Sequence, residues 1–133
     1  MLAAGDAFLL SLGDDPTMKH LFVVISDPSQ DAQRVVFVNV TSWEEGKDDA
    51  CFLDPADWAA ACPFIRHESC IEYRRARIVP SSMIEKWFED GVAERRDNVG
   101  PQLLRKILAG AQESRFLPNN CVLILADQGL IRL

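Results

Sequence analysis

Residues 20–42 read HLFVVISDPSQDAQRVVFVNVTS and contain the two strongest strand signals of the chain. The runs 20–26 and 35–42 are almost continuously apolar and rich in β-branched residues, which is typical of buried strands. The polar segment 27–31 closes the first run. Parallel pairing requires a crossover of a dozen or more residues, so this short connection predicts that the two strands are antiparallel neighbours.

Shorter strand-like runs lie on both sides of this pair. Residues 5–12 predict a first strand, and the sequence Gly-Asp-Asp-Pro at 13–16 has the composition of a turn. Beyond the pair, the segments expected to be extended are 51–53, 63–65, 69–73 and 76–79, the last one ended by Pro80. These short antiparallel strands predict a compact β-barrel over residues 5–79.

Helical periodicity replaces strand periodicity after Pro80. One apolar stripe recurs at helical spacing, and Ser82 with Glu85 fits a capping box. Pro101 suits the first position of a second helix, so residues 81–115 are expected to form two amphipathic helices. Asp54 and Pro55 likewise predict a single helical turn. The first stripe consists of Ile84, Trp87, Phe88 and Val92.

The C-terminal segment 121–133 is expected to be a strand or a tail. Two apolar runs, 121–125 and 130–133, flank the turn-like sequence Asp-Gln-Gly at 127–129. No linker divides the 133 residues, so the chain is predicted to be a single domain, 1–133. The fold class is therefore mainly β (α+β), a small antiparallel barrel followed by two amphipathic C-terminal helices.

The composition excludes several classes of protein. A net charge of −6 argues against binding nucleic acid through bulk charge, although a few residues could still form a local basic site. No apolar run reaches about 18 residues, so no membrane-spanning helix is expected. The N-terminus does not resemble a signal peptide, which predicts a cytoplasmic protein. Gly-rich phosphate loops, His-Glu-x-x-His and Gly-x-Ser-x-Gly are missing from the sequence.

The cysteines and the acidic residues have structural explanations. Without a secretory signal, Cys51, Cys62, Cys70 and Cys121 are expected to be reduced thiols, and the last two lie in apolar runs. A zinc site using Cys62, His67 and Cys70 together with Cys51 is an alternative, but this spacing is looser than in structural zinc sites. Asp54 and Asp57 could form an acid pair or a magnesium site, whereas capping and solvation explain them more simply.

The segment 66–77, RHESCIEYRRAR, is the richest in functional groups. Arginine forks suit phosphate oxygens, a tyrosine ring can stack on a base, and His67 can transfer protons near neutral pH. If the segment is extended throughout, Tyr73, Arg75 and Arg77 share one face and Arg74 lies on the other. The alternative is a strand edge whose arginines pair with carboxylates.

Three other residues are candidates for the same chemistry. Lys19 and His20 stand at the head of the second strand, where a cation and an imidazole could contact a phosphate. Their alternative role is to protect a strand edge from aggregation. Trp43 follows the third strand and could stack on a ligand, although packing is the simpler explanation for this side chain.

Several short sequence motifs occur in a characteristic order along the chain. They are Gly5-Asp6 at the first strand, Lys19-His20 before Leu-Phe-Val-Val-Ile-Ser at 21–26, and Asn-Val-Thr-Ser at 39–42. Ser-Cys-Ile at 69–71, Ala-Arg-Ile-Val at 76–79 and the helix from Pro101 follow. In this layout the chain resembles the PemK/MazF growth-inhibitor family, which implies an SH3-like barrel. The sequence departs from the family at the arginine before the second strand, where Lys19 or His20 stands.

The resemblance implies a metal-independent toxin-type endoribonuclease that cleaves single-stranded RNA without a cofactor. It also implies a homodimer and an antitoxin protein as partners, and no association with a membrane. The alternatives are a non-catalytic SH3-like barrel that binds a protein, and an unrelated small enzyme using His67 with Asp54 or Asp57. The candidate catalytic residues are Lys19, His20, Thr41 and His67, and the candidate RNA-binding residues are Ser42, Trp43, Arg66, Ser69, Tyr73, Arg74 and Arg75.

Overall fold

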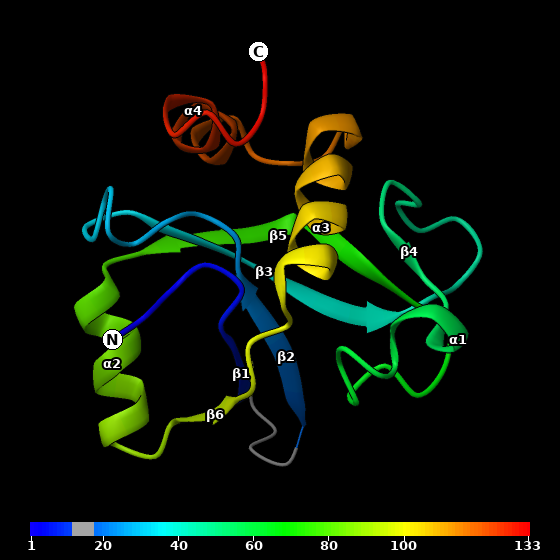
Figure 1. Ribbon diagram of the computed structural model, residues 1–133, viewed down its shortest axis with the longest axis horizontal. Coiled ribbons are helices and arrows are strands. Elements are labelled where there is room, and N and C mark those ends of the chain that lie inside the picture. The colour runs from blue at the N-terminus through cyan, green and yellow to red at the C-terminus, as the bar shows by residue number, and fades with distance from the viewer. Residues whose placement is uncertain (12–17) are drawn as a thin grey trace.

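A computed structural model describes residues 1–11 and 18–133 of the protein (Figure 1). The turn expected at 13–16 and the end of the first expected strand, Leu12, lie outside these residues. The elements are β1 (Ala7–Ser11), β2 (Lys19–Val24), β3 (Val35–Ser42), β4 (Phe52–Leu53), α1 (Pro55–Trp58), β5 (Ser69–Val79), α2 (Ser81–Glu89), β6 (Ala93–Arg96), α3 (Pro101–Glu113) and α4 (Asn119–Asp127).

The strands form one six-stranded sheet in the order β4-β5-β3-β2-β1-β6. Every neighbouring pair is antiparallel, which confirms the predicted antiparallel strands and the α+β class. The predicted closure into a barrel is not confirmed, because the sheet is open. Its two end strands have two and four residues, and each pairs with one neighbour only among the described residues.

Both faces of the sheet are covered by helices (Figure 1). Val36, Val38 and Val40 of β3 point into a core shared with α3 and α4. Val35 and Phe37 point the other way, into an aromatic core beneath α2. Strand β3 is therefore buried on both faces, which explains its continuous apolar sequence.

Strand β5 contains a register shift that corrects the predicted faces. Phe37 pairs with Arg77 while Asn39 pairs with Glu72, so β5 carries extra residues between these two pairs. Such an irregularity interrupts the simple alternation of side chains. Tyr73 consequently packs in the core beneath α3 and α4, whereas Arg77 is opposite Phe37 on the α2 face. The expectation that Tyr73 and Arg77 share a face is therefore wrong. The expected break between 73 and 76 is also absent, since one strand spans both runs.

The C-terminal segment is a helix and not the expected strand. Helix α4 buries Cys121, Ile124 and Leu125, which is the i, i+3, i+4 spacing of one helical face. The apolar run 121–125 is so short that its sequence fits a buried strand as well as a helix. Gly129, at φ 72°, follows the helix in the left-handed conformation that often ends helices.

The region between α2 and α3 contains a strand that the sequence pattern did not indicate. Helix α2 ends at Glu89, so Val92 does not extend its stripe, and β6 pairs with β1. The predicted capping box is also wrong, because Pro80 is the N-cap and no side-chain hydrogen bond caps the helix. The segment 63–65 forms turns in place of an extended strand.

Two predicted helix starts are confirmed. Pro101 occupies the first turn of α3, and the Asp54 carboxylate accepts a hydrogen bond from the Ala56 amide at the start of α1. Within residues 1–11 and 18–133, no helix is long and apolar enough to cross a membrane.

Candidate functional site

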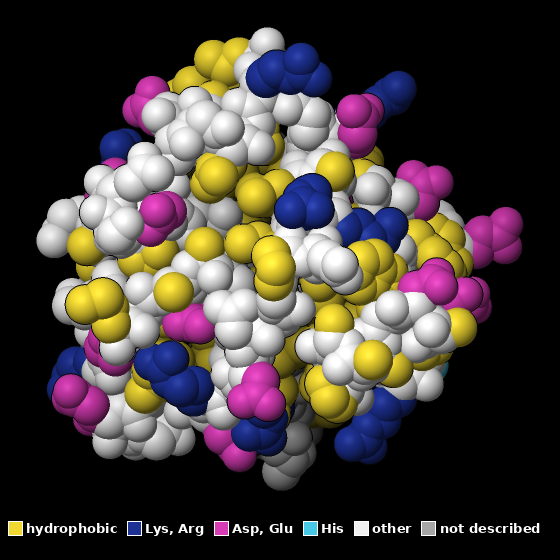
Figure 2. Space-filling view, in the orientation of Figure 1, with side chains coloured by type: hydrophobic (Ala, Val, Ile, Leu, Met, Phe, Trp, Pro, Cys, Tyr) yellow, Lys and Arg dark blue, Asp and Glu magenta, His cyan; other side chains and the backbone are white. Residues whose placement is uncertain are grey.

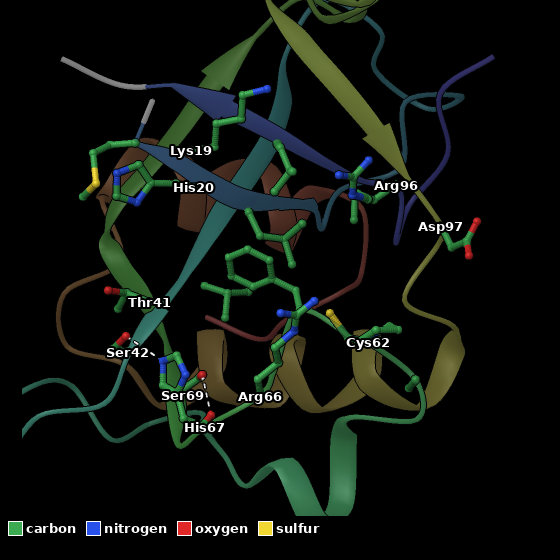
Figure 3. Close-up of a pocket in the computed structure, with 18 of the residues that line it drawn as sticks. Lys19, His20, Thr41, Ser42, Cys62, Arg66, His67, Ser69, Arg96 and Asp97 are labelled. Atoms are coloured by element: carbon green, nitrogen blue, oxygen red, sulfur yellow. Dashed lines mark hydrogen bonds between the residues drawn. The ribbon is translucent and has the colours of Figure 1, made fainter. Parts of the chain in front are cut away.

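A pocket of about 780 Å³ lies where β2 begins and β3 ends (Figure 3). Its apolar lining includes Leu9, Leu21 and Val40 from three adjacent strands. The segment 61–67, which connects α1 to β5, forms another part of the wall, and Arg96 and Asp97 at the end of β6 close the rim. An apolar floor with a polar rim is the usual composition of a ligand site.

The lining of the pocket is basic although the protein is acidic. Lys19, Lys47, Arg66 and Arg96 line it beside two acidic residues, Glu44 and Asp97. On the face in Figure 2, acidic and basic side chains are interspersed and form no continuous basic surface. The sequence predicted that any anion site in a chain of net charge −6 would be local, and this pocket has that character.

His67 is positioned by a tightly turned segment. Cys62 and Ile65 are buried and anchor this segment in the core. The Ile65 amide donates to the Cys62 carbonyl oxygen, and the Ser69 hydroxyl donates to the carbonyl oxygen of His67. The His67 Nε2 atom lies 2.8 Å from the Ser42 hydroxyl oxygen, so the serine orients the imidazole ring (Figure 3).

Thr41 lies at the rim of the pocket. The Lys47 ammonium donates to the Thr41 hydroxyl oxygen at 3.3 Å and to the Ser42 carbonyl oxygen at 2.8 Å. The Thr41 hydroxyl points away from the centre of the pocket (Figure 3). Since the hydroxyl accepts from Lys47, its own proton stays available to a second partner.

The other cations differ in how far carboxylates neutralise them. Glu94 accepts from Arg96 at 2.9 Å and from Lys19 at 3.4 Å, and chiefly the interaction with Arg96 holds the pKa of Glu94 below its usual range. All three side chains are about half exposed, so solvent screens these pairs. Among the described residues, the Arg66 guanidinium has no ion pair or hydrogen bond.

Seven of the eleven candidate residues line the pocket together. His20 directly precedes Leu21, which pairs with Val40, and Thr41 follows Val40, so antiparallel pairing brings the two candidates to one end of the sheet. This proximity follows from the register and is not visible in the separate motifs. The seven residues are Lys19, His20, Thr41, Ser42, Arg66, His67 and Ser69.

The remaining four candidates do not line this pocket. Tyr73 is fully buried and donates its hydroxyl hydrogen bond to the Ile107 carbonyl oxygen at 2.6 Å, so its predicted stacking on a base is wrong. Trp43 packs edge-on against Phe52. Arg74 and Arg75 lie elsewhere along β5, where Arg74 covers the Phe116 ring and Arg75 pairs with Glu72.

Lys47, Arg96 and Phe64 line the pocket and were not among the candidates from the sequence. Lys47 lies in the polar loop between β3 and β4, and Arg96 belongs to the unexpected strand β6. Phe64 lines the pocket and is 42% exposed, which is unusual for a large aromatic side chain. The only signal for Phe64 was its place next to the segment 66–77.

The cysteines are buried, unpaired thiols. Burial raises the pKa of the Cys51 and Cys121 thiols from 9.0 to about 11 and also raises the pKa of Cys62 and Cys70. Such thiols are poor nucleophiles at neutral pH. In the part of the chain that the structure describes, no group of three or more His, Cys, Asp or Glu residues could hold a metal ion.

No protein-family model matches this chain, and no curated protein matches it significantly.

Proposed function

We propose that this chain is a metal-independent endoribonuclease that cleaves single-stranded RNA, as the PemK/MazF-type toxins that its sequence resembles do. The observation that carries the proposal is one pocket lined by both histidines, four basic side chains and three hydroxyl side chains. The open six-stranded sheet would then be a diverged form of the SH3-like barrel of that family. The homodimer and the antitoxin stay predictions.

The two histidines suit the proton transfers of RNA cleavage. In this reaction the ribose 2′-oxygen forms a bond to phosphorus while the bond from phosphorus to the 5′-oxygen breaks. We assign His67, oriented by Ser42, as the base that accepts the 2′-hydroxyl proton. His20, on the opposite part of the lining, is the acid that donates a proton to the leaving 5′-oxygen. The products are a 2′,3′-cyclic phosphate and a 5′-hydroxyl.

Arg66 is our candidate for stabilising the charge on the phosphate. Its guanidinium has no partner among the described residues, and a guanidinium can donate two hydrogen bonds to phosphate oxygens. Lys19, which with His20 is one of the two residues at the place of the family arginine, is already paired with Glu94. The guanidinium that the arginine supplies in the family would thus come from a different segment of this chain.

Phe64 is our candidate for contacting a base. Cys62 and Ile65 anchor its turn in the core, which leaves the Phe64 ring partly exposed at the pocket beside Arg66. Aromatic rings stack on unpaired bases of any identity. A substrate that must unstack a base to reach this ring would be single-stranded.

The first test is cleavage of a long single-stranded RNA in EDTA. We expect fragments with 2′,3′-cyclic phosphate ends, and a loss of at least about 100-fold in rate for His67→Ala and for His20→Ala. An RNA with 2′-deoxyribose at the cleavage site should stay intact, because the nucleophile is missing. Equal cleavage by wild type and by the His20→Ala, His67→Ala double variant would contradict the assignment.

The second candidate is a non-catalytic module that binds a protein partner. Two observations favour it: Lys19 is already paired with Glu94, and the Thr41 hydroxyl points away from the centre of the pocket. If every RNA stays intact with the wild-type protein and the pocket variants bind RNA as wild type does, this candidate replaces the ribonuclease.

A further inference from the structure

The outer edge of β5 is unpaired over most of its length. On its inner side β5 pairs with β3 at residues 69–72 and 77–79, on either side of the register shift. On its outer side β4 pairs only with Ser69 and Cys70, and the Ile71 amide donates to the Cys51 carbonyl oxygen. From Glu72 to Val79, no backbone hydrogen bond leaves this outer edge within the described residues. An open strand edge of this kind is a template for another strand.

A second pocket lies along the same edge. It measures about 170 Å³ and is lined by the consecutive residues 70–74, by Gly46, Lys47 and Asp48 from the loop before β4, and by Phe116. The Phe116 ring is 44% exposed and lies under the Arg74 guanidinium. The start of the open edge is therefore accessible, and an apolar side chain could occupy the space beside Phe116.

The charge of this edge selects the type of partner. Arg74, Arg75 and Arg77 are exposed along it, and of these three arginines only Arg75 forms an ion pair with Glu72, whose carboxylate also accepts a hydrogen bond from Asn39. A second copy of the chain, paired edge to edge, would bring the two sets of arginines together, and like charges opposite each other destabilise a sheet. An acidic segment would neutralise them.

We propose that the outer edge of β5, residues 72–79, binds an extended acidic peptide segment of a partner protein as an added strand. The backbone of the segment pairs with the open edge, its carboxylates pair with the arginines, and one apolar side chain enters the pocket beside Phe116. This division between backbone affinity and side-chain specificity is general for strand addition. The proposal does not depend on ribonuclease activity.

The test uses a fluorescent peptide of four Val-Glu repeats at low ionic strength. We expect saturable binding in fluorescence anisotropy and slower amide hydrogen exchange at residues 72–79 when the peptide is bound. A peptide with N-methyl groups on alternate residues keeps its charge but loses donors of the ladder, so it should bind at least about tenfold more weakly. A Val-Lys peptide should not bind.

Matched variants locate the site on the protein. Arg77→Glu should weaken binding at least about tenfold, whereas Arg105→Glu on α3, with the same change of charge, should change it less than about twofold. Equal binding of the methylated and unmethylated peptides would overturn the proposal, because charge alone would then explain the binding. The absence of binding to the folded wild-type protein would overturn it as well.

Discussion

At the residue scale, Arg66 and Arg75 test which arginines contact RNA. Both belong to the segment 66–77 and are exposed, but only Arg66 lines the pocket, while Arg75 pairs with Glu72. Arg66→Ala should weaken binding of a non-cleavable 2′-O-methyl RNA about tenfold and lower the slope of log affinity against log salt by about 0.7. Arg75→Ala should leave both unchanged. Titrations at several salt concentrations measure both, and equal effects of the two variants would contradict the site.

At the same scale, the sequence indicated candidate residues without their surroundings. Three of these candidates, Arg66, His67 and Ser69, line one pocket because they are close in sequence. Tyr73 had the right chemistry for stacking but is buried, since the register shift in β5 leaves it in the core beneath α3. Local composition cannot show which side of such a shift a side chain takes.

At the element scale, the contact between α3 and β5 depends on Gly110. A Cβ atom there would lie 2.7 Å from the Cys51 Cβ and would overlap the Tyr73 hydroxyl. Gly110→Ala should therefore destabilise the protein by about 1–3 kcal/mol, although alanine favours helices. Denaturant unfolding measures this, with Ala109→Met on the exposed side of α3 as the control within about 0.5 kcal/mol of wild type. A more stable Gly110→Ala variant would show that α3 does not pack this closely.

Elements with strong local signals were predictable, and those formed by distant contacts were not. The strand over residues 35–42 was predicted with its observed bounds, because its apolar β-branched run has no helical alternative. Strand β6 is polar, with the sequence Ala-Glu-Arg-Arg, and exists through its pairing with β1. Helix α4 was missed for a different reason. Its apolar run fits both the helical and the strand period, and only packing in the folded protein selects the helix.

At the scale of the whole molecule, buried acids predict a loss of stability at alkaline pH. The folded state holds the protons of Cys51 and Cys121 up to a pKa of about 11, and burial also raises the pKa of Tyr73. Below pH 9 the folded and the unfolded state both keep the thiol protons, so the thiols do not lower the unfolding free energy. Between pH 9 and 11 only the unfolded state releases them, and each thiol lowers the unfolding free energy by about 1.4 kcal/mol per pH unit.

Denaturant midpoints measured from pH 8 to 10.5 test this loss. In Cys121→Ala the midpoint should decline less steeply with pH, because one of the titrating thiols is missing. At pH 7 and pH 8, where the thiol keeps its proton in both states, the substitution should change the midpoint by the same amount. A decline that is as steep in this variant as in wild type would show that other groups cause it.

The sequence by itself determined the α+β class, the antiparallel pairing of its central strands and the starts of α1 and α3, because these depend on near neighbours. Only the tertiary structure decided that the sheet is open, that α4 is a helix and that His20, Thr41 and His67 share a pocket. The physical reason is that strand order, register and burial arise from contacts between residues far apart in the chain. The local hydrophobic pattern of a segment does not show these contacts.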